Sequence, residues 1–177
     1  MDENTTRGLM SSGNIPIPEA GEIDAAYCLK LLYLIRDVVF STVDAEGLPS
    51  SRVIDVMYTD ERRLYFLAPR GKAFYAELMS KPYVAITGQT TDFRMCRLRG
   101  RVVHPTDRYE QRRLVDWLFA LNPDMGKLYP GDTRYVIEVF IWKRAKENTS
   151  TWGKSRFCAF RFVLGKTADA ALGEGSR

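Results

Sequence analysis

The alternation of apolar and polar residues predicts a chain in which strands outnumber helices. Short runs rich in β-branched and aromatic residues, separated by glycine, proline and charged turns, are typical of strands. They occur at 38–43, 51–58, 64–68, 83–88, 94–103 and 135–142, with a short further strand at 157–163. Apolar residues at helical spacing predict three helices, at 23–36, between Gly71 and Lys81, and from Asp107 to Asn122.

Two of these elements have a clear division into faces. The last helix carries an apolar stripe that we expect to be buried, formed by Leu114, Trp117, Leu118 and Leu121. The strand at 94–103 has small or apolar residues alternating with mostly basic ones: Cys96, Leu98 and Gly100 against Met95, Arg97, Arg99 and Arg101. Because successive side chains point to opposite faces of a strand, we expect one face of this strand to meet solvent or a ligand.

The order of the elements predicts the fold class. The strands follow one another mainly in meanders, with helices inserted between the third and fourth strands and between the fifth and sixth. This order favours an α+β, mainly β, barrel with helices packed outside. The 177 residues are enough for one domain with a sizeable core. We expect that domain at 21–165, with a flexible arm at 1–20 and a disordered tail at 166–177.

Composition and charge narrow the classes of partner. Hydrophobic residues make up 45% of the chain and charged residues 27%, as in a globular protein. The formal charge of +4 suits a phosphorylated ligand but does not establish nucleic-acid binding. The longest apolar runs fall short of the roughly 20 residues of a membrane span, and the polar start lacks a secretory signal. We therefore expect a cytoplasmic protein without a membrane partner.

The cysteine and histidine content argues against a disulfide framework or a zinc site. Cys28, Cys96 and Cys158 form no C-x-x-C pair, and His104 is the only histidine. Buried free thiols are the simplest interpretation of the cysteines. His104 stands beside Pro105 at a strand end, where we expect a surface residue without an assigned role.

The joint order of several motifs resembles a known family. A helix is followed by VVFSTVDAEGLPSSRVIDV, LYFLAPRGKAFYAELMSKPYVAI, RMCRLRGRVV, NPDMGKLY and YVIEVFIW. Over about residues 24–152 this order resembles the short bacterial pyridoxamine 5'-phosphate oxidase-like proteins. The resemblance implies an FMN-binding split β-barrel that works as a homodimer, with FMN at the subunit interface.

The same resemblance implies a phosphate site around the third strand and the helix after it. Arg52 stands where the family commonly has a strand arginine, and Lys72 stands where a basic residue opens the helix, two positions after Arg70. A helix N-terminus with a nearby cation suits a phosphate, and Gly71 allows the backbone to come close. The alternative for Arg70-Gly71-Lys72 is a solvated turn.

The flavin ring is expected to lie along the second and third strands. The resemblance places Val53, Ile54 and Asp55 of the second strand and Leu67 and Ala68 of the third beside it. Arg97 matches the arginine of the family pattern W-x-R-x-x-G, with Gly100 in register and Met95 in place of the tryptophan. The other arginines of that strand suit an exposed polar face equally well. Trp142 and Trp152 suit either flavin cover or, more readily, core packing.

These features predict an FMN-dependent oxidoreductase of an unidentified small molecule, reduced by a donor such as a nicotinamide nucleotide. Oxidation of vitamin B6 is not expected, because the chain lacks the C-terminal histidine with which true pyridoxamine phosphate oxidases hold the substrate phosphate. The alternative is a non-catalytic binder or carrier of flavin, deazaflavin or haem with the same fold. A weaker third alternative, single-stranded nucleic acid on the arginine-rich strand, is disfavoured by the evenly mixed acidic residues.

Overall fold

The computed structural model describes residues 24–91, 94–143, 156–163 and 166–167, the last two ranges by their main chain only. The expected arm at 1–20, Trp152, the side chain of Cys158 and the tail from residue 168 lie outside the described residues. The described strands are β1 Asp37–Val43, β2 Pro49–Asp55, β3 Tyr58–Thr59, β4 Arg63–Pro69, β5 Tyr83–Gln89, β6 Arg94–Val103, β7 Ile137–Lys143, β8 Arg156–Val163 and β9 Lys166–Thr167. The helices are α2 Ala25–Ile35, α3 Ala73–Ser80, α4 Arg108–Leu121, α5 Met125–Leu128 and the 3₁₀ helix η3 Gly131–Val136.

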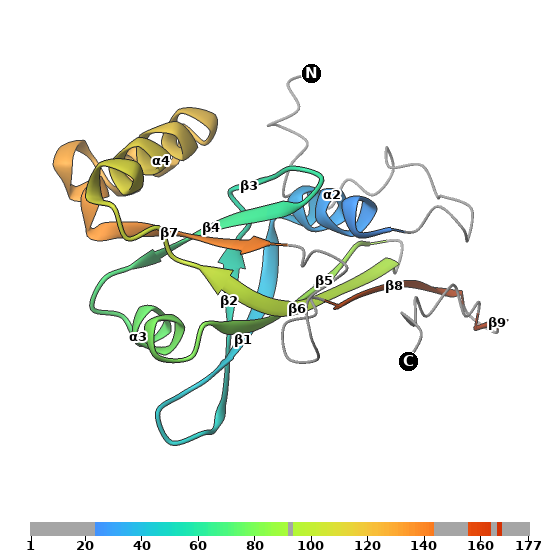
Figure 1. Ribbon diagram of the computed structural model, residues 1–177. Helices are drawn as coiled ribbons and strands as arrows, with labels where there is room; N and C mark the ends of the chain where they lie inside the picture. The colour runs from blue at the N-terminus through green and yellow to red at the C-terminus, as the bar shows by residue number, and fades with distance from the viewer. Residues whose placement is uncertain (1–23, 92–93, 144–155, 164–165, 168–177) are drawn as a thin grey trace.

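The strands form one antiparallel sheet in the order β2-β1-β5-β6-β7-β4-β3 (Figure 1). β8 pairs with β6 and with the short β9, and β2 and β3 are the two ends of the main path, so the sheet does not close. In Figure 1, α2 and α4 lie along the upper side of the strands and α3 lies at the lower left. This arrangement confirms the α+β, mainly β, split barrel with helices outside.

Two apolar clusters lie on the two sides of the strands β4 and β7. The larger cluster joins α2 and α3 to the barrel interior, with Phe40, Phe66 and Phe140 at its centre. The smaller cluster lies under α4 and includes Leu67 and Val139. Because neighbouring residues of a strand point to opposite faces, β4 and β7 each supply side chains to both clusters.

Helix α2 packs closely enough against the sheet that glycine is needed beneath it. The helix begins at Asp24, whose Oδ1 accepts a hydrogen bond from the Tyr27 amide at 2.8 Å. A Cβ at Gly88 of β5 would lie 2.9 Å from both Ile35 Cδ1 and Leu32 Cδ2. The absence of a side chain at Gly88 therefore sets how deeply α2 is seated.

Several sequence predictions are confirmed. Cys28 and Cys96 are buried free thiols, and Trp142 packs in the larger cluster rather than at the surface. On β6, Cys96 and Leu98 are buried while Arg97, Arg99 and Arg101 are exposed, as the alternation predicts. Among the described residues, no helix has the length and apolar character required to cross a membrane.

Other predictions are wrong in detail. The strand expected at 51–58 is interrupted at Val56 and Met57, which are buried between β2 and β3. The strand expected at 135–142 begins only at Ile137, because η3 takes up the residues before it. The expected stripe of α4 is also misplaced: Trp117 is 36% exposed and Leu121 37%. The buried residues of this helix are Gln111, Val115, Leu118 and Phe119.

Candidate cofactor site at the start of helix α3

The start of α3 is open and positively charged. Gly71 has φ +82°, and a Cβ built on it would meet no atom within 4 Å, so the chain turns here beside open space. Lys72 is the N-cap residue, and no side chain caps the helix. The first amide groups of a helix have no partner within the helix, which leaves them available to an anion. The Lys72 side chain is exposed and makes no hydrogen bond or ion pair with the described residues.

Arg52 reaches the same helix from strand β2. Its Nη2 lies 2.8 Å from Glu77 Oε2 in α3, and its guanidinium lies over the Phe74 ring at 4.6 Å from the centroid. Thr42 Oγ1 and Ser50 Oγ also accept hydrogen bonds from this guanidinium. Arg52 is therefore held beside the first turn of α3 by groups of β1, β2 and α3.

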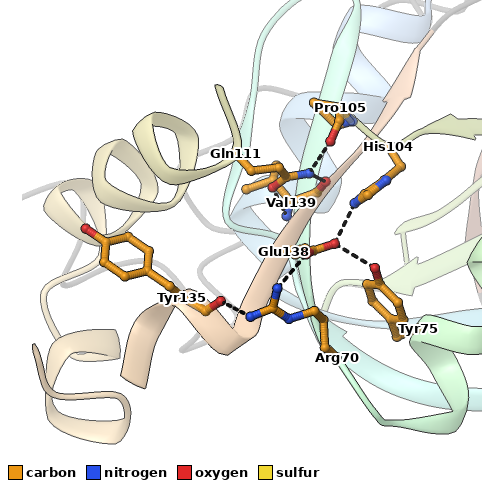
Figure 2. Close-up of polar contacts among 8 residues, drawn as sticks. All are labelled: Arg70, Tyr75, His104, Pro105, Gln111, Tyr135, Glu138 and Val139. Carbon is orange, nitrogen blue, oxygen red and sulfur yellow. Dashed lines mark hydrogen bonds and ion pairs between the residues drawn. The ribbon is translucent and has the colours of Figure 1, made fainter. Parts of the chain in front are cut away.

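A second polar group, which we call the Glu138 cluster, fastens the turn before α3 to strand β7. It consists of Glu138, Arg70, Tyr75 and His104 (Figure 2). Glu138 Oε2 accepts hydrogen bonds from the Tyr75 hydroxyl and from His104 Nε2, each at 2.7 Å. Its Oε1 accepts from Arg70 Nη1 at 3.3 Å. An ionised carboxylate can only accept hydrogen bonds, so three segments of the chain donate to one side chain.

His104 is not the surface residue that we expected. Its side chain is only 17% exposed, its Nε2 donates to Glu138, and its ring lies 4.8 Å from that of Phe140. The buried Gln111 of α4 accounts for this position (Figure 2). Its Nε2 donates to the Pro105 carbonyl at 2.9 Å and to the Val139 carbonyl of β7, and its Oε1 accepts from the Val139 amide. Gln111 thereby draws the end of β6 against β7 and turns His104 inward.

The environment of Tyr75 favours its neutral form. Burial, the hydrogen bond to Glu138 and the charge of that carboxylate together raise the pKa of Tyr75 to about 12. The hydroxyl therefore stays a hydrogen-bond donor throughout the physiological range of pH.

Comparison with known proteins identifies the family. The family model described as pyridoxamine 5'-phosphate oxidase matches residues 32–134. The chain belongs to the pyridoxamine 5'-phosphate oxidase family. The matched range includes Arg52, the whole of α3 and its preceding turn, and His104. No curated protein matches the sequence.

Several solved structures share the fold at low sequence identity. A NimC/NimA family protein of Clostridium acetobutylicum matches with a TM-score of 0.52 and 17% identity, over 70% of this chain and 78% of that one. A conserved hypothetical protein of Mycobacterium tuberculosis matches with a TM-score of 0.57 and 13% identity, over 92% of this chain and 97% of that one. An F420 reductase matches with a TM-score of 0.51 and 17% identity, over 66% of this chain and 92% of that one. At such identities the likeness establishes the fold alone.

The fold brings some of the sequence-predicted family site residues together and separates others. Arg52, Arg70 and Lys72 lie around the start of α3. Val53 is 64% exposed on the outer face of the sheet. Val53 pairs with Val39 of β1, which pairs with Thr87 of β5, which in turn pairs with Arg97 of β6. Arg97 is therefore three strand spacings, or about 14 Å, from Val53. Val53 and Arg97 thus share a face without being neighbours.

The remaining predicted residues are partly committed to packing. Ala68 belongs to the larger apolar cluster and Leu67 to the smaller one, whereas Ile54 is half-buried against the larger cluster. The Asp55 carboxylate accepts a hydrogen bond from Arg36 Nε at 2.9 Å, which raises the pKa of Arg36. Ile54 and Asp55 can meet a ligand through partly exposed side chains, whereas Leu67 and Ala68 are buried and have only their main chain for this purpose.

Sequence reasoning missed Glu77, Glu138 and Tyr75 as parts of the site. Two signals were present. Glu138 is the only charged residue inside the apolar run YVIEVFIW, and an isolated carboxylate in such a strand needs partners. Glu77 falls at helical spacing on the face that contains Phe74 and Leu78, which makes it a buried carboxylate that requires a cation.

Proposed function

We propose that this protein binds FMN with the phosphate at the start of α3. The observation that carries the proposal is the exposed Lys72 at an uncapped helix N-terminus, after a turn at Gly71 that is open to solvent. A phosphate there gains hydrogen bonds from the first amides of α3 and a charge-assisted bond from Lys72. Family membership makes a flavin the natural ligand for such a phosphate site.

Each predicted residue except Arg70 then has a proposed part in holding the cofactor. Lys72 contacts the phosphate, and Arg52 adds positive charge at the first turn of α3. The ion pair with Glu77 orients the Arg52 guanidinium. The ring lies along β2 at Val53, Ile54 and Asp55 and along β4 at Leu67 and Ala68. Arg97 extends the site on the outer face of β6, about three strands from Val53.

The proposed activity is that of an oxidoreductase acting on a small molecule, with a nicotinamide nucleotide as a candidate electron donor. When bound, FMN supplies the hydride or electron transfer, so the protein needs to bind, orient and shield the ring. The apolar and exposed Val53 suits contact with a ring, and the cations around α3 suit the phosphate end.

We also propose that the protein acts as a cytoplasmic homodimer. Val39 and Val53 lie opposite each other in the β1–β2 register, and both are exposed on the outer face of the sheet. A second copy placed on this face covers the two valines and brings further residues beside the cofactor. Light scattering after size exclusion tests the dimer, and Val53→Asp is expected to shift it towards monomer.

The decisive experiment is the visible absorption spectrum of the purified protein, with the released cofactor identified by mass. FMN titrated into the cofactor-free form then gives the affinity, and oxidation of NADH or NADPH with an electron acceptor tests turnover. Flavin bands and released FMN support the proposal. A colourless protein whose thermal stability does not change with FMN excludes it.

A deazaflavin binder or carrier is the second candidate. The F420 reductase with the same fold motivates this alternative, since F420 is also a ligand with a phosphate. The two candidates separate in a competition titration: FMN binding with turnover favours the oxidoreductase. Preference for F420, or FMN binding without any turnover, favours the alternative.

A further inference from the structure

We propose that Glu138 is a positioning residue for the phosphate site, and that Arg70 acts through Glu138 instead of contacting the phosphate. This inference rests on the proposed FMN site at α3 and goes further, because it assigns a role to residues on β4, β6 and β7. Three features of the Glu138 cluster carry it.

First, Arg70 has partners within the protein on both guanidinium nitrogens Nη1 and Nη2, although its side chain is 45% exposed. Its Nη2 donates to the Tyr135 carbonyl at 2.7 Å and its Nη1 donates to Glu138, while its backbone amide binds the Val136 carbonyl at 2.9 Å. Main chain and side chain together fasten the turn before α3 to the segment that enters β7. A phosphate that drew the Arg70 guanidinium to the start of α3 would have to compete with these partners for its orientation.

Second, the carboxylate of Glu138 holds the chain on both sides of Lys72. Arg70 lies two residues before Lys72, and Tyr75 lies three residues after it, on the first turn of α3. Bonds on both sides restrict the position of the intervening backbone. The direction in which Lys72 and the first amides of α3 point is therefore set by a side chain that touches neither of them.

Third, Glu138 has a strong reason to keep these partners. Its side chain is 15% exposed, and a largely buried carboxylate is unfavourable unless donors surround it. Tyr75 and His104 satisfy one oxygen and Arg70 the other. Because all three donors meet at one carboxylate, removing its charge loosens the turn, the helix start and the end of β6 together.

The two possible roles of Arg70 predict opposite results for Glu138→Gln. If Glu138 positions the turn, the variant binds FMN more weakly, by about tenfold for a loss of roughly 1.4 kcal/mol. Riboflavin has no phosphate, so its affinity is expected to stay within about twofold of the wild type. If Arg70 is instead a direct phosphate ligand, removing the competing carboxylate frees it, and FMN binds more tightly.

The experiment compares FMN and riboflavin affinities, by quenching of flavin fluorescence, in the wild type, Glu138→Gln, Arg70→Ala and Asp60→Asn. Asp60 is the matched control, because its carboxylate also accepts from an arginine, Arg63, but it lies in the turn between β3 and β4. We expect FMN-selective weakening in the first two variants and none in the control. Tighter FMN binding, or equal losses for both flavins, overturns the inference.

Amide hydrogen exchange of residues 70–76 without ligand provides a second readout. Exchange in Glu138→Gln is expected to be faster than in the wild type and in Asp60→Asn, and unchanged exchange rejects the positioning role. A wild type that binds no FMN defeats the proposed function by itself. The exchange result then still decides whether Glu138 orders this turn.

Discussion

The guanidinium of Arg52 and the carboxylate of Glu77 lie 2.8 Å apart, with exposures of 20% and 8%. Strand β2 and helix α3 are thereby joined by an ion pair at the edge of the apolar cluster, under the proposed phosphate site. The Thr42 hydroxyl contacts both side chains, so the pair is hydrogen-bonded as well as charged. This geometry gives Arg52 a structural role in addition to any role in binding.

Glu77→Gln is expected to destabilise the fold by about 3–5 kcal/mol, because it leaves a largely buried arginine without its counter-charge. The double variant Arg52→Met with Glu77→Leu is expected to lose less stability, since neither charge then remains. Urea unfolding measures the free energy of unfolding of the single and the double variant. The exposed pair of Asp124 and Lys127 is the control, and its removal should leave the urea midpoint nearly unchanged, because water screens both charges. Equal effects at the two pairs contradict the role of burial.

Lys72→Gln is expected to weaken FMN binding by about 10- to 100-fold, the range for a lost hydrogen bond to a charged group. Riboflavin binding should change little. Lys30→Gln on α2 is the control, because Lys30 is also exposed and lies on another element. Flavin titration monitored by fluorescence checks the result. Equal affinity of wild type and Lys72→Gln for FMN places the phosphate elsewhere.

Gly88→Ala is expected to destabilise the protein by about 1–3 kcal/mol, because the added methyl group overpacks the contact with α2. Its Cβ would lie 3.0 Å from Val38 Cγ1, closer still to Leu32 and Ile35. Gly126→Ala in α5 is the matched control, since a Cβ there meets nothing within 4 Å. Thermal unfolding of the two variants should separate them clearly. A neutral Gly88→Ala indicates that α2 can move away from the sheet.

Tyr75 makes stability depend on pH in the alkaline range. Its pKa rises from 10.0 to about 12 in the folded protein, so the folded state binds this proton more tightly than the unfolded state. The resulting stabilisation is complete below pH 10 and is lost as the pH rises through about 12. Between these two pH values, the free energy of unfolding measured with a chemical denaturant should fall more steeply for the wild type than for Tyr75→Phe. Parallel pH profiles contradict the assignment.

The local elements were predictable because their signals are local. The β-branched residues of β1 and the charged turn after β3 marked strands that the structure contains. The polar residues from Thr106 to Glu110 marked the start of α4, where the Asp107 carboxylate accepts from the Glu110 amide. The proposal of a phosphate site at Lys72 came only from the resemblance. The tripeptide Arg70-Gly71-Lys72 alone favours a solvated turn.

The errors arose where distant segments decide the outcome. Trp117 was expected in the core, but its ring packs edge-on against Tyr58 and Tyr65 at 4.8 and 5.5 Å and keeps one side exposed. His104 was expected at the surface because its partner, Glu138, lies 34 positions later in the chain. The spacing of apolar residues along a helix or strand does not reveal such contacts between distant segments.

The Glu138 cluster also has a consequence for when, during folding, the proposed cofactor can bind. As the chain leaves the ribosome, Arg70, Tyr75 and His104 are made first, and their common acceptor follows 68, 63 and 34 residues later. A nascent chain that ends before β7 contains Lys72 and α3 but lacks the carboxylate that orients them. Binding of the proposed cofactor is therefore expected in the last stage of folding, after β7 with Glu138 has joined the barrel.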